Sequence, residues 1–164
     1  RLRLDANGLM TVEDAKNFLR RLKNLDLVEY IEDITVDSGN WLSLQQQFPV
    51  PLASDRVDAA DPIASVKIWK PMLKEFPKNI STHVITNNFD HPLGIAVALY
   101  ETLMDRPHLL QPQGLLHRSL YDCGTYTECL KESGPNLFRP DGTGFGFDGL
   151  LEAEAWTGIQ TLLS

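Results

Sequence analysis

The stretch Arg-Leu-Arg-Leu-Asp-Ala-Asn-Gly (1–8) has the pattern of a strand that runs into a loop. Polar and apolar residues alternate from Arg1 to Leu4, as they do in a half-buried strand, and the run stops at Asp5. Thr11-Val-Glu-Asp14 then has the spacing of a capping box, and apolar residues recur at helical spacing after it. The sequence therefore predicts a βα unit with the carboxylate of Asp5 at the carboxyl end of its strand.

The same pattern recurs twice along the chain. Leu27-Val-Glu-Tyr-Ile31 is followed by Glu32, and Val50-Pro-Leu-Ala53 is followed by Asp55. The carboxylates are about 27 and about 23 residues apart, close to the length of one strand, one helix and two short loops. At the shared mouth of such strands three carboxylates would repel one another unless a hard cation such as Mg²⁺ held them. The alternative is that acidic residues are simply common at strand ends and helix caps.

A fourth strand is predicted over Ser65-Val-Lys-Ile-Trp69, with Lys70 at its end. Only about nine residues separate Asp55 from this strand, fewer than a helical crossover needs. Either this βα unit has lost its helix, or residues are missing between Asp55 and Ser65. A lone lysine such as Lys70 is most often a solvated surface residue.

A fifth strand is predicted over His83–Phe89, and His91-Pro-Leu-Gly94 then begins a largely apolar helix. Asn87 and Asn88 stand at the end of this strand, where their amides could bind a substrate carboxylate or cap the helix. Gly114–His117 is a weaker candidate for a last strand. The sequence then offers at most six strand ends, whereas a closed (β/α)₈ barrel needs eight.

The βα rhythm is lost in the last part of the chain. Ser133–Gly149 is rich in glycine and proline, which is typical of loops, and Leu150–Leu163 could close as a short helix with Trp156 packed inward. We expect a partial barrel over residues 1–130 and a return segment over residues 131–164 that packs on the barrel or on a capping domain.

Composition limits the classes of function. The 164 residues are 43% hydrophobic and carry a formal net charge of −7, with a pI near 5.0, which argues against nucleic acid as the partner. The sequence has no apolar run of membrane-spanning length, and a cytoplasmic protein is the default expectation. The two cysteines, Cys123 and Cys129, form no zinc or disulfide pattern and are expected to be free thiols.

Five segments, taken in order, resemble the enolase superfamily. They are Leu-Asp-Ala-Asn (4–7), Tyr-Ile-Glu-Asp (30–33), Pro-Leu-Ala-Ser-Asp (51–55), Lys-Ile-Trp-Lys-Pro-Met (67–72) and Val-Ile-Thr-Asn-Asn-Phe-Asp-His-Pro-Leu-Gly (84–94). The likeness runs over most of the chain, and within the superfamily it is greatest to the o-succinylbenzoate synthase family of the menaquinone pathway.

This resemblance implies an α/β fold, the C-terminal part of an enolase-type (β/α) barrel with its strands 3 to 8. The first metal ligand of the superfamily follows the third barrel strand, and here it is residue 5. An N-terminal capping domain and the first strands are therefore expected to be absent from this chain and to be required by it. The resemblance also implies a Mg²⁺ site at Asp5, Glu32 and Asp55. It further implies a full βα unit after Asp55, so we expect that residues are missing between Asp55 and Ser65.

The same resemblance assigns roles around the substrate. Lys70 would be the catalytic lysine that faces the substrate, opposite a general base from a Lys-x-Lys motif in a strand that this sequence does not contain. Asn7, Asn87 and Asn88 would contact a small-molecule carboxylate substrate.

The implied reaction is the dehydration of a succinyl-hydroxycyclohexadiene carboxylate to o-succinylbenzoate through an ene-diolate, an intermediate that a divalent cation stabilises. Dipeptide epimerases and muconate cycloisomerases share the carboxylate triad and remain alternatives. So does a non-catalytic barrel remnant that acts as a binding or scaffold protein.

Overall fold

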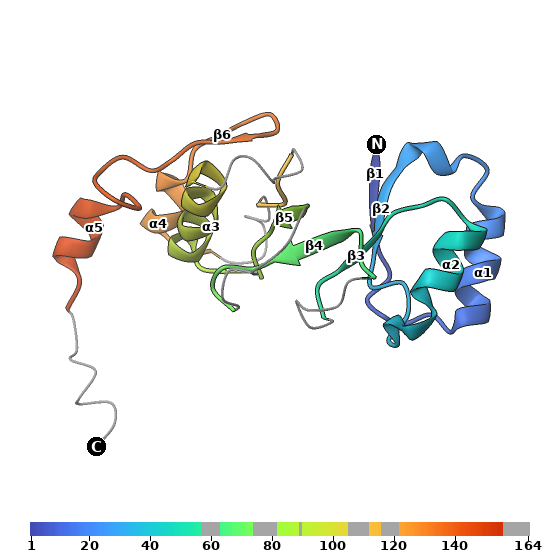
Figure 1. The fold of residues 1–164 in the computed structure, drawn as a ribbon. Helices are drawn as coiled ribbons and strands as arrows, with labels where there is room; N and C mark the ends of the chain where they lie inside the picture. The colour runs from blue at the N-terminus through green and yellow to red at the C-terminus, as the bar shows by residue number, and fades with distance from the viewer. Residues whose placement is uncertain (57–62, 74–81, 89, 105–111, 116–121, 156–164) are drawn as a thin grey trace, which may run out of the picture.

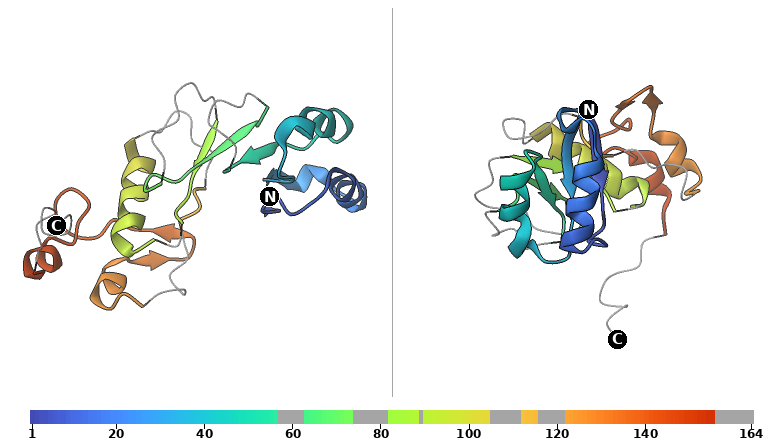
Figure 2. Two further views of the ribbon diagram at one scale, coloured as in Figure 1. Left: turned by 90° about the horizontal axis from the view of Figure 1, so that it is seen from below. Right: turned by 90° about the vertical axis from the view of Figure 1, so that its right-hand side faces the viewer.

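The computed structural model describes residues 1–56, 63–73, 82–88, 90–104, 112–115 and 122–155. Its centre is a parallel sheet in the order β1-β2-β3-β4-β5, curled like half of a barrel (Figures 1 and 2). The five strands are β1 (Leu2–Asp5), β2 (Val28–Glu32), β3 (Leu52–Ser54), β4 (Val66–Trp69) and β5 (His83–Ile85). The structure confirms the expected α/β fold with a partial barrel. The enolase type of this barrel and the numbering of its strands as 3 to 8 remain expectations.

The predicted first βα unit is confirmed. Helix α1 (Val12–Arg21) begins after Thr11, whose hydroxyl accepts a hydrogen bond from the backbone N–H of Asp14 at 3.1 Å. The carboxylate of Asp14 in turn accepts from the backbone N–H of Thr11, which completes the capping box. Each contact satisfies a backbone donor that the first helical turn leaves without a partner.

Strand alternation gives the sheet two different faces. One face packs against α1 and α2 (Trp41–Gln47), with Leu4, Ile31 and Leu52 in this part of the core (Figure 1). The opposite face carries a second buried group: Tyr30, Ala53, Val66, Ile68 and Val84. Because side chains alternate along a strand, Asp5 and Glu32 lie on this second face.

The connection between β3 and β4 is only partly described, since residues 57–62 lie outside the described part of the chain. The expectation of missing residues between Asp55 and Ser65 falls on this segment and stays a prediction. The strands nevertheless pair directly and in parallel, with Ala53 opposite Val66 and Ser54 opposite Lys67.

Strand β5 is shorter than predicted, since it ends at Ile85 rather than near Phe89, which itself lies outside the described residues. The chain turns here because the backbone N–H of Asn88 donates to the carboxylate of Asp90 at 3.1 Å. Just before the turn, Thr86 forms a parallel bridge with Gly114. Gly114, the first residue of the weaker strand expected over Gly114–His117, is thus paired beside β5.

Helix α3 (Pro92–Met104) follows β5 as predicted, and the C-terminal elements lie beside it (Figure 1). These elements are α4 (Thr125–Cys129), the hairpin of β6 (Glu132–Ser133) and β7 (Asn136–Leu137), and α5 (Asp148–Ala153). Ile95 and Ala96 of α3 share one buried cluster with Leu130 and Phe147. Phe147 therefore packs on α3, whereas the return segment expected over residues 131–164 and the division at residue 130 stay predictions.

The C-terminal helix differs from the expected Leu150–Leu163. It begins earlier, at Asp148, and ends at Ala153, because the backbone of Glu154 is extended, with φ −74° and ψ 141°. Trp156 lies outside the described residues. Cys123 and Cys129 are free thiols, as expected. No helix in the described ranges has the length and apolar character that crossing a membrane requires.

Replacing the capping residue of α1 tests the local origin of this fold. Thr11→Ala should lower the free energy of unfolding by about 1 kcal/mol, because the N–H of Asp14 loses its acceptor. Urea denaturation followed by circular dichroism measures the change. Thr125→Ala, at an exposed threonine in the first turn of α4, is the matched control, and equal losses in the two variants would contradict this role of Thr11.

Candidate metal centre

The parallel register brings two of the expected carboxylates to the same edge of the sheet. Asp5 and Glu32 are direct partners in the pairing of β1 with β2, and Glu32 is in turn the partner of Ala53 in β3. Asp55 follows β3 by one residue. The strand ends therefore place Asp5, Glu32 and Asp55 on three adjacent strands, as the sequence pattern requires.

A third acidic side chain, which the sequence analysis did not select, joins Glu32 and Asp55. Carboxylate oxygens of Glu32, Asp33 and Asp55 all lie within 4.8 Å of one another, and Asp5 is not part of this closest group. Asp33 is buried and has a left-handed backbone, with φ 43°. Its side chain would point to the helix-covered face if the strand continued, and the backbone turn brings it to the edge instead.

Two side chains of the acidic cluster, Glu32 and Asp33, have raised pKa values. Burial raises the pKa of Glu32 to about 8, and the charges of Asp5, Asp55 and Asp33 add to this effect, whereas the charge of Lys70 opposes it. Burial also raises the pKa of Asp33, although hydrogen bonds from the backbone of Asp55 and Arg56 lower it in part. A cation at this edge would favour the ionised form of both groups.

Lys70 belongs to the same charge cluster. It follows β4, and its Nζ donates to Oδ2 of Asp55 at 2.5 Å, with both side chains largely shielded from solvent at 16% and 15% exposure. Lys70 is therefore not a solvated surface lysine. Its role toward a substrate stays a prediction.

Asn7 lies in the loop after β1 and contacts two charged groups. Its backbone N–H and its side-chain Nδ2 donate to the two carboxylate oxygens of Asp5, at 2.8 and 3.1 Å. The guanidinium of Arg56 donates to the carbonyl oxygen of Asn7 at 2.8 Å and to its Oδ1 at 2.9 Å. These contacts orient Asp5, and a contact of Asn7 with substrate remains a prediction.

The other two asparagines lie after β5. Nδ2 of Asn87 donates to the carbonyl oxygen of Leu115 at 3.1 Å, which ties the end of β5 to the neighbouring segment. Asn88 is exposed in the turn described above. The N-terminal turn of α3 is capped by His91, whose Nδ1 accepts from the backbone N–H of Leu93 at 3.2 Å. Substrate binding by Asn87 and Asn88 remains a prediction.

The donor set of the cluster fits a hard divalent cation. All the available ligand atoms are carboxylate oxygens, which Mg²⁺ prefers, and their mutual repulsion is what a bound cation would relieve. The half-buried carboxylate of Glu32 is desolvated and lies among other acidic groups, and a bound cation would offset both costs of its ionised form.

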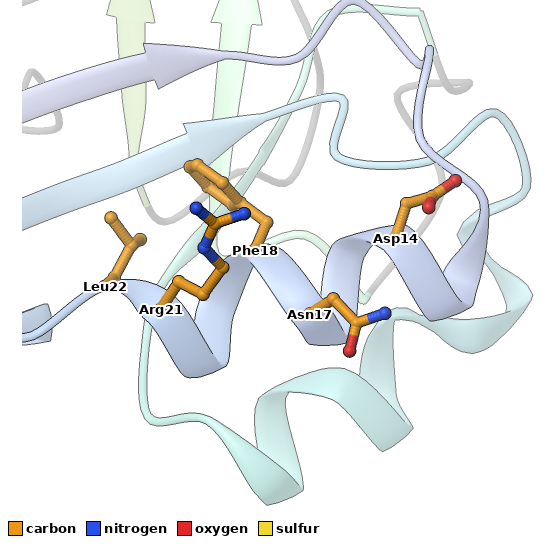
Figure 3. Close-up of a pocket in the computed structure, with 5 residues that line it drawn as sticks. All are labelled: Asp14, Asn17, Phe18, Arg21 and Leu22. Carbon is orange, nitrogen blue, oxygen red and sulfur yellow. The ribbon is translucent and has the colours of Figure 1, made fainter.

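Two hollows in the described surface lie elsewhere. One, of about 450 Å³, is lined by Asp14, Asn17, Phe18, Arg21 and Leu22 along α1 (Figure 3). The other, of about 230 Å³, lies between α3 and the glycine-rich loop, with Tyr100 and Phe145 among its lining residues. Neither is lined by a residue expected at the metal or substrate site.

Comparison with known proteins supports the resemblance found in the sequence. No protein-family model matches the chain. The chain is 30% identical to o-succinylbenzoate synthase of Bdellovibrio bacteriovorus over 95% of its own length. It covers 53% of that protein, so it spans about half the length of the curated relative that it matches. The aligned region is 175 residues, longer than this chain of 164, so the relative contains residues there that have no counterpart here.

The acidic cluster should bind Mg²⁺ through Glu32 and Asp55, which belong both to the expected ligand set and to the observed cluster. Glu32→Gln and Asp55→Asn should each weaken binding at least about tenfold, because each removes an anionic ligand. Isothermal titration of the chain with Mg²⁺ measures the affinity. Asp122→Asn, which changes an exposed acid outside the cluster, is the control, and an unchanged affinity in the first two variants would contradict the site.

Proposed function

We propose that this chain is part of a Mg²⁺-dependent lyase of the enolase type, which dehydrates a succinyl-hydroxycyclohexadiene carboxylate to o-succinylbenzoate. The observation that carries this proposal is the similarity to an o-succinylbenzoate synthase along 95% of the chain. The acidic cluster at the sheet edge supports it independently, because it offers ligands for a divalent cation. Proton removal beside a carboxylate creates negative charge that such a cation would stabilise.

In this proposal Glu32 and Asp55 hold the cation together with Asp5, and Asp33 holds the loop of Asp55. Asp33 accepts the backbone N–H of Asp55 at 3.2 Å and lies 3.6 Å from the guanidinium of Arg56, so protein groups already contact both of its oxygens. Asp5 is exposed, and hydrogen bonds from Asn7 orient its carboxylate. A bound Mg²⁺ would stabilise the negative charge that develops on the substrate carboxylate.

Lys70 supplies a second positive charge in the proposed site. Its ammonium group lies beside Asp55 on the strand that follows the carboxylate strands, and it faces the same edge of the sheet. There it would stabilise the anion formed from the substrate, while the general base comes from a part of the protein that precedes this sequence. The complete protein would therefore include a capping domain and the first barrel strands.

Assay of the complete gene product tests the reaction. Incubation with the cyclohexadiene substrate and Mg²⁺ should yield o-succinylbenzoate, measured by chromatography, and EDTA should abolish the product. Turnover of a dipeptide or of a muconate in place of this substrate would instead show another proton-abstracting enzyme of the superfamily. Absence of turnover with all three substrates would favour a non-catalytic binding protein.

Lys70→Met in the complete protein separates the charge of this residue from its volume. Turnover should fall by about a hundredfold or more, because the anion loses its electrostatic partner, whereas Mg²⁺ affinity should not weaken. Lys70→Arg should rescue poorly, since a planar fork replaces a compact ammonium group.

The control is Lys131→Met, which removes an exposed lysine that also pairs with an aspartate. Its turnover should stay at the wild-type rate. Undiminished turnover in Lys70→Met would show that Lys70 takes no part in the reaction.

A further inference from the structure

Arg56 links three strand-end loops, although it is an exposed residue that follows β3. Its Nη1 and Nη2 donate to the backbone and side-chain oxygens of Asn7, in the loop after β1. Its Nε lies 3.6 Å from Oδ2 of Asp33, in the loop after β2. One side chain on the loop after β3 therefore contacts the loops that follow β1 and β2.

Each of these contacts continues to a proposed metal ligand. On the β1 side, Asn7 donates two hydrogen bonds to the carboxylate of Asp5. On the β2 side, Asp33 accepts the backbone N–H of Asp55 through its other carboxylate oxygen. The network thus runs from Asp5 through Asn7, Arg56 and Asp33 to Asp55, and Glu32 is not one of its members.

We propose that Arg56 is a positioning residue that holds the loops carrying Asp5 and Asp55, and thereby orients these two carboxylates toward a shared divalent cation. This inference rests on the proposed metal site and adds to it a residue outside the ligand set. Partners that orient metal ligands contribute strongly to affinity, and their loss typically weakens metal binding about 10- to 100-fold.

The shape of the side chain matters as much as its charge. The guanidinium has several N–H donors in one plane, so it reaches two oxygens of Asn7 and still faces Asp33, whereas a lysine ammonium is a single point of charge. The positive charge also offsets part of the repulsion among the acidic loops when no cation is bound. Near a bound cation the same charge is unfavourable, which makes the two roles of Arg56 separable by experiment.

Arg56→Lys in the 164-residue chain keeps the positive charge and replaces the planar guanidinium group with a compact ammonium group. Isothermal titration with Mg²⁺ should show about tenfold weaker binding, while thermal unfolding followed by circular dichroism stays close to that of the wild type. Arg56→Gln removes the charge as well, which by electrostatics alone would tighten cation binding. Positioning by Arg56 predicts weaker binding in this variant too.

Arg20→Lys is the matched control. Arg20 is exposed to a similar extent, 54% against 59% for Arg56, and it also pairs with a carboxylate, but it lies in α1. Its replacement should leave Mg²⁺ affinity unchanged.

A double variant tests the path through the β1 loop. Asn7→Gly removes the amide side chain at a residue with φ 52°, a conformation that glycine adopts without strain. If Arg56 acts through Asn7, the combined variant Asn7→Gly with Arg56→Lys should lose less affinity than the two single losses predict together.

The outcomes separate this inference from the proposed function. If the wild-type chain binds no Mg²⁺, the proposed metal site is wrong and the role of Arg56 falls with it. If the wild type binds Mg²⁺ but Arg56→Lys binds it equally well, or Arg56→Gln binds it more tightly, only the positioning role is overturned. Weaker binding in both Arg56 variants, with the fold and the Arg20 control unchanged, supports it.

Discussion

The parallel pairing of β1, β2 and β3 is the constraint on which the candidate site depends. In a parallel sheet all strands end at the same edge, so acidic residues that follow successive strands must meet there. Asp5 and Glu32 are direct register partners, and Asp55 lies one residue beyond β3. The fold thus concentrates negative charge at one edge, at a cost in repulsion and desolvation that the raised pKa of Glu32 expresses.

Much of this arrangement can be predicted from the sequence, because local signals determine it. The capping box at Thr11 fixes the start of α1, and apolar runs followed by an acid locate β1, β2 and β3. The sequence pattern predicts too late an end for β5, because the turn at Asn88 depends on a hydrogen bond to Asp90, which competes with strand pairing. The sequence pattern also misses the start of α5 at Asp148 and the extended backbone at Glu154, because the local composition indicates neither.

Asp33 and Arg56 show where sequence reasoning fails at the site itself. Asp33 comes directly after Glu32, so the alternation of a strand assigns its side chain to the wrong face. Its positive φ, which is uncommon outside glycine, redirects it, and no sequence pattern encodes that conformation strongly. Arg56 offers no sequence signal at all, since an exposed arginine is ordinary until its contacts are known. Both residues act through long-range contacts, which local periodicity cannot represent.

The hydrogen bond from the guanidinium of Arg3 to the carbonyl oxygen of Pro112 has a consequence for how the chain folds. It joins residues that are 109 positions apart, and Pro112 shortly precedes Gly114, which forms the bridge with Thr86. Strand β1 pairs with β2, Asp5 opposite Glu32, across a much shorter stretch of chain, so closing that loop costs less entropy than closing the loop to Pro112. The contact with Pro112 closes a long loop and must wait until α3 has been synthesised, so the first strand of the sheet completes its contacts among the last.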